Sequence, residues 1–159
     1  MTESSATGAS TKVSRIIKVP RNTVYQAFLD KDSVVAWLPP NNMTGQMHTF
    51  EPREGGKFRM SLTYIDPTKS PPGKTSENMD TVQGRFVTLI PNETIVQVFE
   101  FESQEPEYAG VLTLTWTLTD AEGGTEVTVL CENIPKGVRL EDNEAGSKES
   151  LQKLAALIE

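Results

Sequence analysis

Apolar residues recur with helical spacing mainly at the end of the chain. Within residues 140–159, Ser147, Leu151, Leu154 and Ile158 follow one another at steps of four, three and four, while Lys148, Glu149, Gln152 and Lys153 fall elsewhere. This spacing predicts an amphipathic helix with one small or apolar stripe. An isolated helix of this length is only marginally stable in water, so the stripe is expected to pack against another element.

Most of the preceding chain alternates apolar and polar residues, which is typical of β-strands with one buried face. The alternation is clearest at residues 57–64 and at residues 110–119, where leucine and tryptophan alternate with threonine. Turn residues separate these strands from others predicted at residues 12–19, 43–50, 81–90, 94–101 and 125–132. Consecutive strands joined by short turns pair antiparallel.

Three segments depart from this alternation. Residues 22–38 favour a bent pair of short helices that ends at the Pro39–Pro40 pair. Residues 66–78 are rich in proline, serine and lysine and have no periodicity, so they predict a long loop, either a solvated hairpin loop or a rim or flap beside a site. Residues 1–11 are predicted to be a disordered arm before a single domain at residues 12–159.

The predicted order of elements is one strand, two short helices, six strands and one long helix. A seven-stranded antiparallel sheet with one dry face needs a cover, which the final helix supplies. The predicted fold is therefore α+β, with the sheet curled around the C-terminal helix. One helix fills only the middle of such a concavity, so a gap is expected at one end, and this gap is the candidate ligand site.

Composition limits the classes of function. The 159 residues carry a net charge of −7, which argues against duplex nucleic acid or an anionic membrane as the main partner. Neither a signal peptide nor a membrane span is evident, so a cytoplasmic location is expected. Cys131 and His48 are each the only residue of their type, which excludes an intrachain disulfide and disfavours a zinc site. We therefore expect no metal and no cofactor.

Several short motifs occur along this order of elements. They are WLP at residues 37–39, FEPREGGKF at 50–58, Gly84 with LIP at 89–91, GT at 124–125 and GSKESLQKLAALIE at 146–159. Together they resemble the START-like or Bet v 1-like helix-grip superfamily, also called SRPBCC domain proteins, and within it the chain is similar to the branch named after the activator of heat-shock protein 90 ATPase. The resemblance covers nearly the whole chain and implies a helix-grip fold with a ligand cavity between the C-terminal helix and the sheet.

The chain departs from this family pattern at one position of the helix stripe. Many relatives carry Gly-Trp where this chain has Gly146 and Ser147. The loss of an indole implies either a larger, more polar cavity or a space filled by Trp37 or Trp116, and we prefer the first interpretation.

The candidate cavity residues are the inward-facing positions of three strands and the helix, with one tryptophan closing an end. They are Trp37, Phe58, Met60, Leu62, Tyr64, Phe99, Leu112, Leu114, Trp116, Ser147, Leu151 and Leu154. The same residues would also suit an ordinary packed core. Tyr64, Ser147 and Gln97 are the polar groups expected to orient a ligand. His48 is expected at the surface and Cys131 in the core.

Three functions follow from this reading. The first is binding of a small hydrophobic or amphipathic ligand in the cavity, by a monomer or homodimer. The second, which the family name implies, is a chaperone ATPase-activating interaction domain. The third is a polyketide cyclase or aromatase-like enzyme, for which the sequence offers no evident acid-base pair and no catalytic residue. We therefore favour a binding protein over an enzyme.

Overall fold

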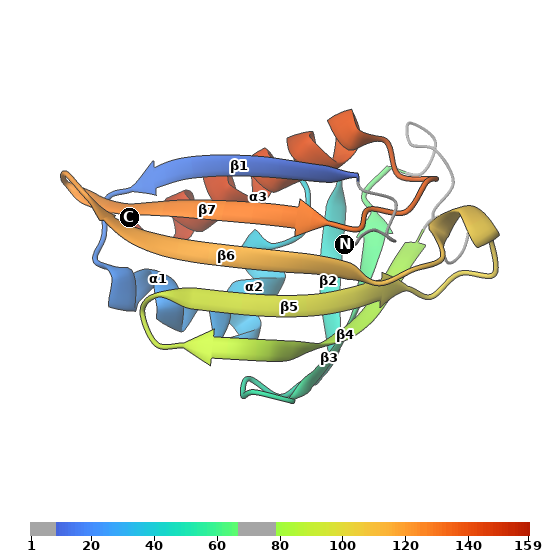
Figure 1. Cartoon of the computed structure of the whole chain (residues 1–159), viewed down its shortest axis with the longest axis horizontal. Coiled ribbons are helices and arrows are strands. Elements are labelled where there is room, and N and C mark those ends of the chain that lie inside the picture. The colour runs from blue at the N-terminus through green and yellow to red at the C-terminus, as the bar shows by residue number, and fades with distance from the viewer. Residues whose placement is uncertain (1–8, 67–78) are drawn as a thin grey trace, which may run out of the picture.

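The computed structural model describes residues 9–66 and 79–159, which form one seven-stranded antiparallel sheet and three α-helices (Figure 1). The helices are α1 (Arg21–Phe28), α2 (Lys31–Trp37) and α3 (Leu140–Ile158), and a 3-10 turn, η2, spans Pro106–Tyr108. The strands are β1 (Ser10–Ile17), β2 (Met43–Phe50), β3 (Lys57–Tyr64), β4 (Met79–Ile90), β5 (Thr94–Phe101), β6 (Leu112–Ala121) and β7 (Gly124–Glu132).

The sheet has the order β1-β7-β6-β5-β4-β3-β2, so the first two strands of the chain form its two edges. All three α-helices lie on one side of it, with α3 running along β1 and packing against α1 and α2 (Figure 1). This arrangement confirms the predicted α+β helix-grip fold, including the two short helices after the first strand. The strand at residue 10 begins two residues before its predicted start, and η2 was not predicted. The predicted loop at residues 66–78 lies, from residue 67 on, outside the described residues.

The inner face of the sheet is closed at the end where α1 and α2 lie. Phe28, Trp37 and Trp116 form a triad of edge-to-face rings with centroids 4.9, 5.0 and 5.5 Å apart. The Trp37 indole donates to the carbonyl of Ala27 at 3.0 Å, and the Trp116 indole donates to Oε1 of Gln97 at 2.9 Å. Both indole N–H groups are therefore satisfied inside the protein, as buried polar groups usually are.

Helix α3 is fixed on its other flank by the loop between α2 and β2. The Ser150 hydroxyl donates to the Leu38 carbonyl at 2.6 Å, and Lys153 Nζ donates to the Pro39 carbonyl at 2.8 Å. Ser150 is consequently buried although the predicted stripe did not include it, whereas Ser147 is only half-buried. Leu151, by contrast, is fully buried as predicted. The C-terminal half of α3 is thus held by both the sheet and the loop.

Candidate ligand site

Strand register decides which side chains of β4 face the helices. Leu62 of β3 lies opposite Asp80, Met60 lies opposite Val82, and side chains directly opposite each other share a face of the sheet. Asp80 therefore lies on the apolar inner face, and only 4% of its surface is exposed. A carboxylate in this position is unusual, because acidic side chains are rarely buried to this extent.

A row of aromatic side chains extends along the inner face away from the tryptophan triad. Phe58, Phe99, Phe101 and Tyr108 form a chain of edge-to-face contacts with successive centroids 6.4 Å apart. Phe99, Phe101 and Tyr108 remain partly accessible, unlike Trp37 and the other rings of the triad. This end of the inner face is therefore less completely covered than the end that carries α1 and α2.

Tyr64 is the last residue of β3, and at this less covered end it lies on the same face of the sheet as Asp80. The residue is 9% exposed, and its hydroxyl has no hydrogen-bond partner in the part of the chain that the structure describes. Burial raises the pKa of the Tyr64 hydroxyl above its usual value. The acidic groups that add to this shift are Asp80 of β4, Tyr108 of η2 and Asp142 of α3. We call these four residues the Tyr64 cluster.

The N-terminal half of α3 borders open space on the same side. Asp142, Gly146 and Ser150 follow one another at steps of four, so they form one column on the helix. A Cβ atom added to Gly146 would have no neighbour within 4 Å. Ser150 contacts the Leu38 carbonyl, so the column is packed at its C-terminal end and open one turn before it.

Replacing Gly146 with alanine is expected to raise the free energy of unfolding by about 0.5 to 1 kcal/mol, because alanine favours a helix and meets no obstacle here. Urea unfolding measures the change. Gly56→Ala is the matched control, since its Cβ would collide with the Glu51 carbonyl, and it is expected to lower stability. A loss of stability in the Gly146 variant would show that this flank of α3 is packed.

The structure places the predicted cavity residues on the inner side of the molecule but gives them different exposures. Eight are almost fully buried, namely Trp37, Phe58, Met60, Leu112, Leu114, Trp116, Leu151 and Leu154. Leu62, Phe99 and Ser147 are half-buried, and Tyr64 belongs to the cluster defined above. The amide oxygen of Gln97, a predicted ligand-orienting group, is instead occupied by Trp116.

Sequence reasoning missed Asp80, Tyr108 and Asp142. The alternation of Asp80 with Val82 was the available signal for Asp80, but the faces of this strand could not be assigned because Phe86, Val87 and Leu89 are all apolar. The structure shows a register shift in this region, between Phe86 and Thr88, which breaks the period of two.

His48 takes part in a hydrogen-bonded chain rather than in the Tyr64 cluster. Its Nε2 lies 2.8 Å from the Ser61 hydroxyl, which lies 3.0 Å from the Thr81 hydroxyl. Ser61 is 6% exposed and Thr81 is 1% exposed. A serine held between two partners in a buried position does not present an accessible nucleophile, although a histidine is beside it.

Cys131 is buried on the inner face, as predicted, and burial raises the pKa of its thiol to about 11. Because the thiolate is the reactive form, alkylation by iodoacetamide at pH 8 is expected to be roughly a hundredfold slower in the folded protein than in urea. Mass spectrometry of timed samples measures both rates. Equal rates would mean that the thiol is exposed in the folded state.

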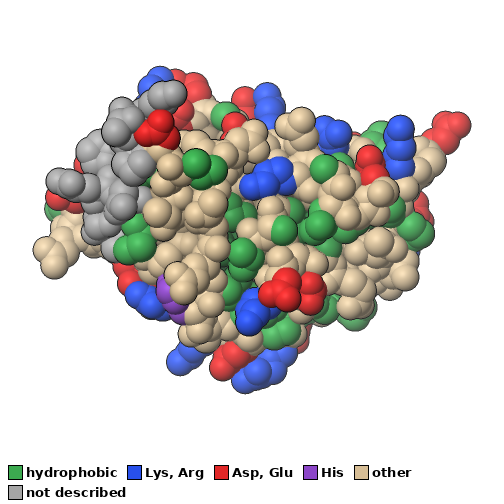
Figure 2. Space-filling model, turned by 180° about the vertical axis from the view of Figure 1, so that it is seen from behind, with side chains coloured by type: hydrophobic (Ala, Val, Ile, Leu, Met, Phe, Trp, Pro, Cys, Tyr) green, Lys and Arg blue, Asp and Glu red, His purple; other side chains and the backbone are tan. Residues whose placement is uncertain are grey.

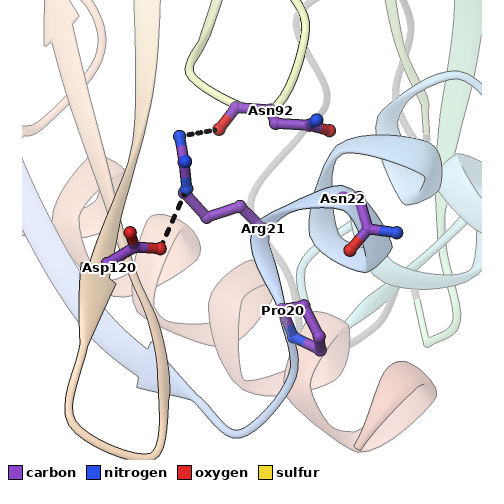
Figure 3. A pocket seen from close by; sticks show the side chains of 5 residues that line it. All are labelled: Pro20, Arg21, Asn22, Asn92 and Asp120. Carbon is purple, nitrogen blue, oxygen red and sulfur yellow. Dashed lines mark hydrogen bonds and ion pairs between the residues drawn. The ribbon is translucent and has the colours of Figure 1, made fainter.

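An open depression of about 460 Å³ lies away from the Tyr64 cluster, and its lining is drawn in Figure 3. Arg21 crosses it, donating from Nε to Asp120 at 2.9 Å and from its terminal nitrogen to the Asn92 carbonyl at 2.9 Å. The guanidinium therefore ties the start of α1 to the turn after β4 and to the end of β6.

The surface of the described residues carries charges of both signs. On the helical side, basic and acidic side chains lie interspersed around hydrophobic ones (Figure 2). Within residues 9–66 and 79–159, no group of three or more His, Cys, Asp and Glu side chains is placed to hold a metal ion. No helix in the described ranges has the length and hydropathy of a membrane span.

Residues 18–159 match the model of one protein family, described as activator of Hsp90 ATPase homolog 1-like protein. A solved structure from Chromobacterium violaceum is 26% identical, with a TM-score of 0.83 over 94% of this chain and 96% of that one. A structure from Arthrobacter aurescens shares the fold at 16% identity, with a TM-score of 0.77 over 98% of this chain and 89% of that one. A structure from Silicibacter pomeroyi does so at 14% identity, with a TM-score of 0.75 over 94% of this chain and 96% of that one. No curated protein matches the chain.

Proposed function

We infer that this chain, which belongs to the activator of Hsp90 ATPase homolog 1-like family, binds a small amphipathic molecule at the Tyr64 cluster. The observation that carries this proposal is Tyr64, a residue that is only 9% exposed and whose hydroxyl has no hydrogen-bond partner in the described chain. Buried polar groups nearly always have a partner, and leaving one unsatisfied costs about 1 to 3 kcal/mol. A ligand group that bonds to this hydroxyl would remove that cost.

The surroundings of Tyr64 support an amphipathic ligand rather than a wholly polar one. The half-buried rings of Phe99 and Phe101 offer an apolar floor, and the open space beside Gly146 offers room on the helix side. The tryptophan triad fills the other end of the inner face, so a ligand would occupy the end of the concavity that η2 borders. Ligand sites of this kind combine an apolar lining with a few polar groups that fix orientation.

Thermal denaturation with a panel of amphipathic molecules, of which 1-octanol is the reference probe, tests the proposal. A ligand that binds only the folded state raises the melting temperature with concentration. Tyr64→Phe is expected to weaken binding about three- to tenfold, since one hydrogen bond contributes about 0.5 to 1.5 kcal/mol. Tyr25→Phe, which removes the same atom from α1, is the matched control and should leave binding unchanged.

Failure of every panel member to shift the melting temperature, together with native mass spectra free of any bound molecule, would overturn the proposal. Stimulation of a chaperone ATPase by the same preparation would then favour the interaction-domain function that the family name carries. Equal weakening by Tyr64→Phe and Tyr25→Phe would place the ligand elsewhere.

A further inference from the structure

The outer face of the sheet points away from the three α-helices, which all lie on its other side (Figure 1). Five half-buried, uncharged side chains lie next to one another at the centre of this face, in two rows that cross the strands. They are Val96 and Val98 of β5, Thr113 and Thr115 of β6, and Leu130 of β7. We call these five residues the outer patch.

The outer patch is more apolar than the solvent-facing side of an antiparallel sheet usually is. Val96 comes directly after the buried Ile95, and successive side chains of a strand point to opposite faces, so Val96 faces outward. The same alternation places Leu130 outward between the buried Val129 and Cys131. Apolar side chains gathered on an uncovered face are typical of a surface that contacts another protein.

Opposite charges lie at the two ends of one row of the outer patch. Arg85 of β4 lies opposite Val98, which lies opposite Thr113, which in turn lies opposite Glu132 of β7. Arg85 and Glu132 are exposed, and neither forms an ion pair or a side-chain hydrogen bond in the part of the chain that the structure describes. Neighbouring strands are about 4.8 Å apart, so roughly 14 Å separates the two residues and they do not pair with each other.

This arrangement is complementary to a second copy of itself. A twofold axis parallel to the strands, midway between β5 and β6, exchanges β5 with β6 and β4 with β7. Arg85 of each copy then lies opposite Glu132 of the other, and Val98 lies opposite Thr113. Sheets packed face to face are about 10 Å apart, a distance that an arginine and a glutamate side chain together span.

We propose that the outer patch is the interface of a symmetric homodimer, in which two sheets pack face to face and two Arg85–Glu132 pairs cross between the copies. An uncharged centre with charged groups at the rim is the usual anatomy of such an interface. The dimer is independent of the proposed ligand site, which lies on the opposite face of the sheet. Because the row spans only four strands, we expect weak, reversible association.

Sedimentation velocity of the full-length protein, at concentrations up to about 1 mM, tests this proposal. Salt at about 0.15 M screens the repulsion between two molecules that each carry a net charge of −7. With rising concentration, the average mass is expected to increase from the 17.5 kDa of the chain towards twice that value.

Arg85→Glu and Glu132→Arg are each expected to weaken self-association at least about tenfold, because each substitution places like charges opposite one another twice. Lys31→Glu on α2 and Glu122→Arg in the turn between β6 and β7 are the matched controls. Both positions are exposed and lie outside the outer patch, so these charge reversals should change self-association less than about twofold.

A mixture of the two interface variants tests the geometry of the dimer. In a mixed dimer of Arg85→Glu with Glu132→Arg, both crossing pairs again have opposite signs, so association is expected to recover to near the wild-type strength. The double variant should self-associate for the same reason. If circular dichroism shows that a charge reversal disturbs the fold, Arg85→Gln, which only removes the charge, should still weaken association by about threefold.

Three results would overturn the proposal. A wild-type protein that stays monomeric at every concentration would leave the outer patch to a different protein. Association that neither charge reversal weakens would place the interface elsewhere on the molecule. Weakening by both reversals without recovery in the mixture or in the double variant would contradict the twofold arrangement.

Discussion

Replacing Trp116 with alanine is expected to lower the free energy of unfolding by about 3 to 5 kcal/mol. The indole is 2% exposed and contacts Phe28 and Trp37 edge-to-face at 5.0 and 5.5 Å. Its removal deletes both ring contacts, leaves a cavity and frees the amide of Gln97. Urea or thermal unfolding followed by circular dichroism measures the loss.

Trp116→Phe and Val87→Ala are the comparison variants for this measurement. Phenylalanine keeps a ring in the triad, so the loss should be smaller, while Val87 is 43% exposed and its truncation should cost less than about 0.5 kcal/mol. Ligand affinity provides a second readout. If Trp116→Phe weakened the probe as strongly as Tyr64→Phe, the triad would line the ligand space rather than close it.

This division between a packed end and a less covered end was only partly predictable. The alternation of Leu112, Leu114, Trp116 and Leu118 with threonine predicted one dry face of β6, and the structure buries all four apolar side chains. The spacing of Leu151 and Leu154 likewise predicted the buried stripe of α3. A period of two or 3.6 residues reports which face of an element is buried, and that was sufficient to predict the fold.

The same periods do not report how far each buried position lies from the helix. Trp37 and Tyr64 were predicted together as cavity residues, with Trp37 closing one end; Trp37 is part of the buried triad, whereas Tyr64 lies on the same face of the sheet as the acidic Asp80. Which of them borders free space depends on where α3 crosses the sheet. That crossing is fixed by hydrogen bonds between distant residues, such as Ser150 with Leu38, for which no local pattern exists.

The acidic members of the Tyr64 cluster could not be predicted from the sequence for a related reason. Asp142 reads as a favourable first-turn residue of a helix, and Tyr108 lies in a stretch rich in acidic residues that has no periodic pattern. Tyr108 and Asp142 both act on Tyr64 as acidic groups although η2 and α3 are far from β3 in the sequence. Tertiary proximity of this kind gives each residue a role that its own segment does not reveal.

Replacing Ser147 with tryptophan is expected to abolish ligand binding while stabilising the empty protein by about 1 to 2 kcal/mol. Ser147 is half-buried on α3, next to Gly146, whose added Cβ would have no neighbour within 4 Å. An indole there would cover on the order of 100 Å² of apolar surface, at about 25 cal/mol per Å² before the entropy of fixing the ring is subtracted. The ring would occupy the space proposed for the apolar part of the ligand.

Ser147→Ala and Thr117→Trp are the matched controls for this substitution. Alanine removes the hydroxyl without filling space, so binding of 1-octanol should change less than about threefold. Thr117 is exposed on β6, so an added indole there should leave both stability and binding nearly unchanged. Binding that persists in a stabilised Ser147→Trp variant would place the ligand away from α3. A destabilised variant would instead mean that the space beside Gly146 is too small for a ring. The ligand site would then be formed by the half-buried aromatic floor of the sheet rather than by the helix.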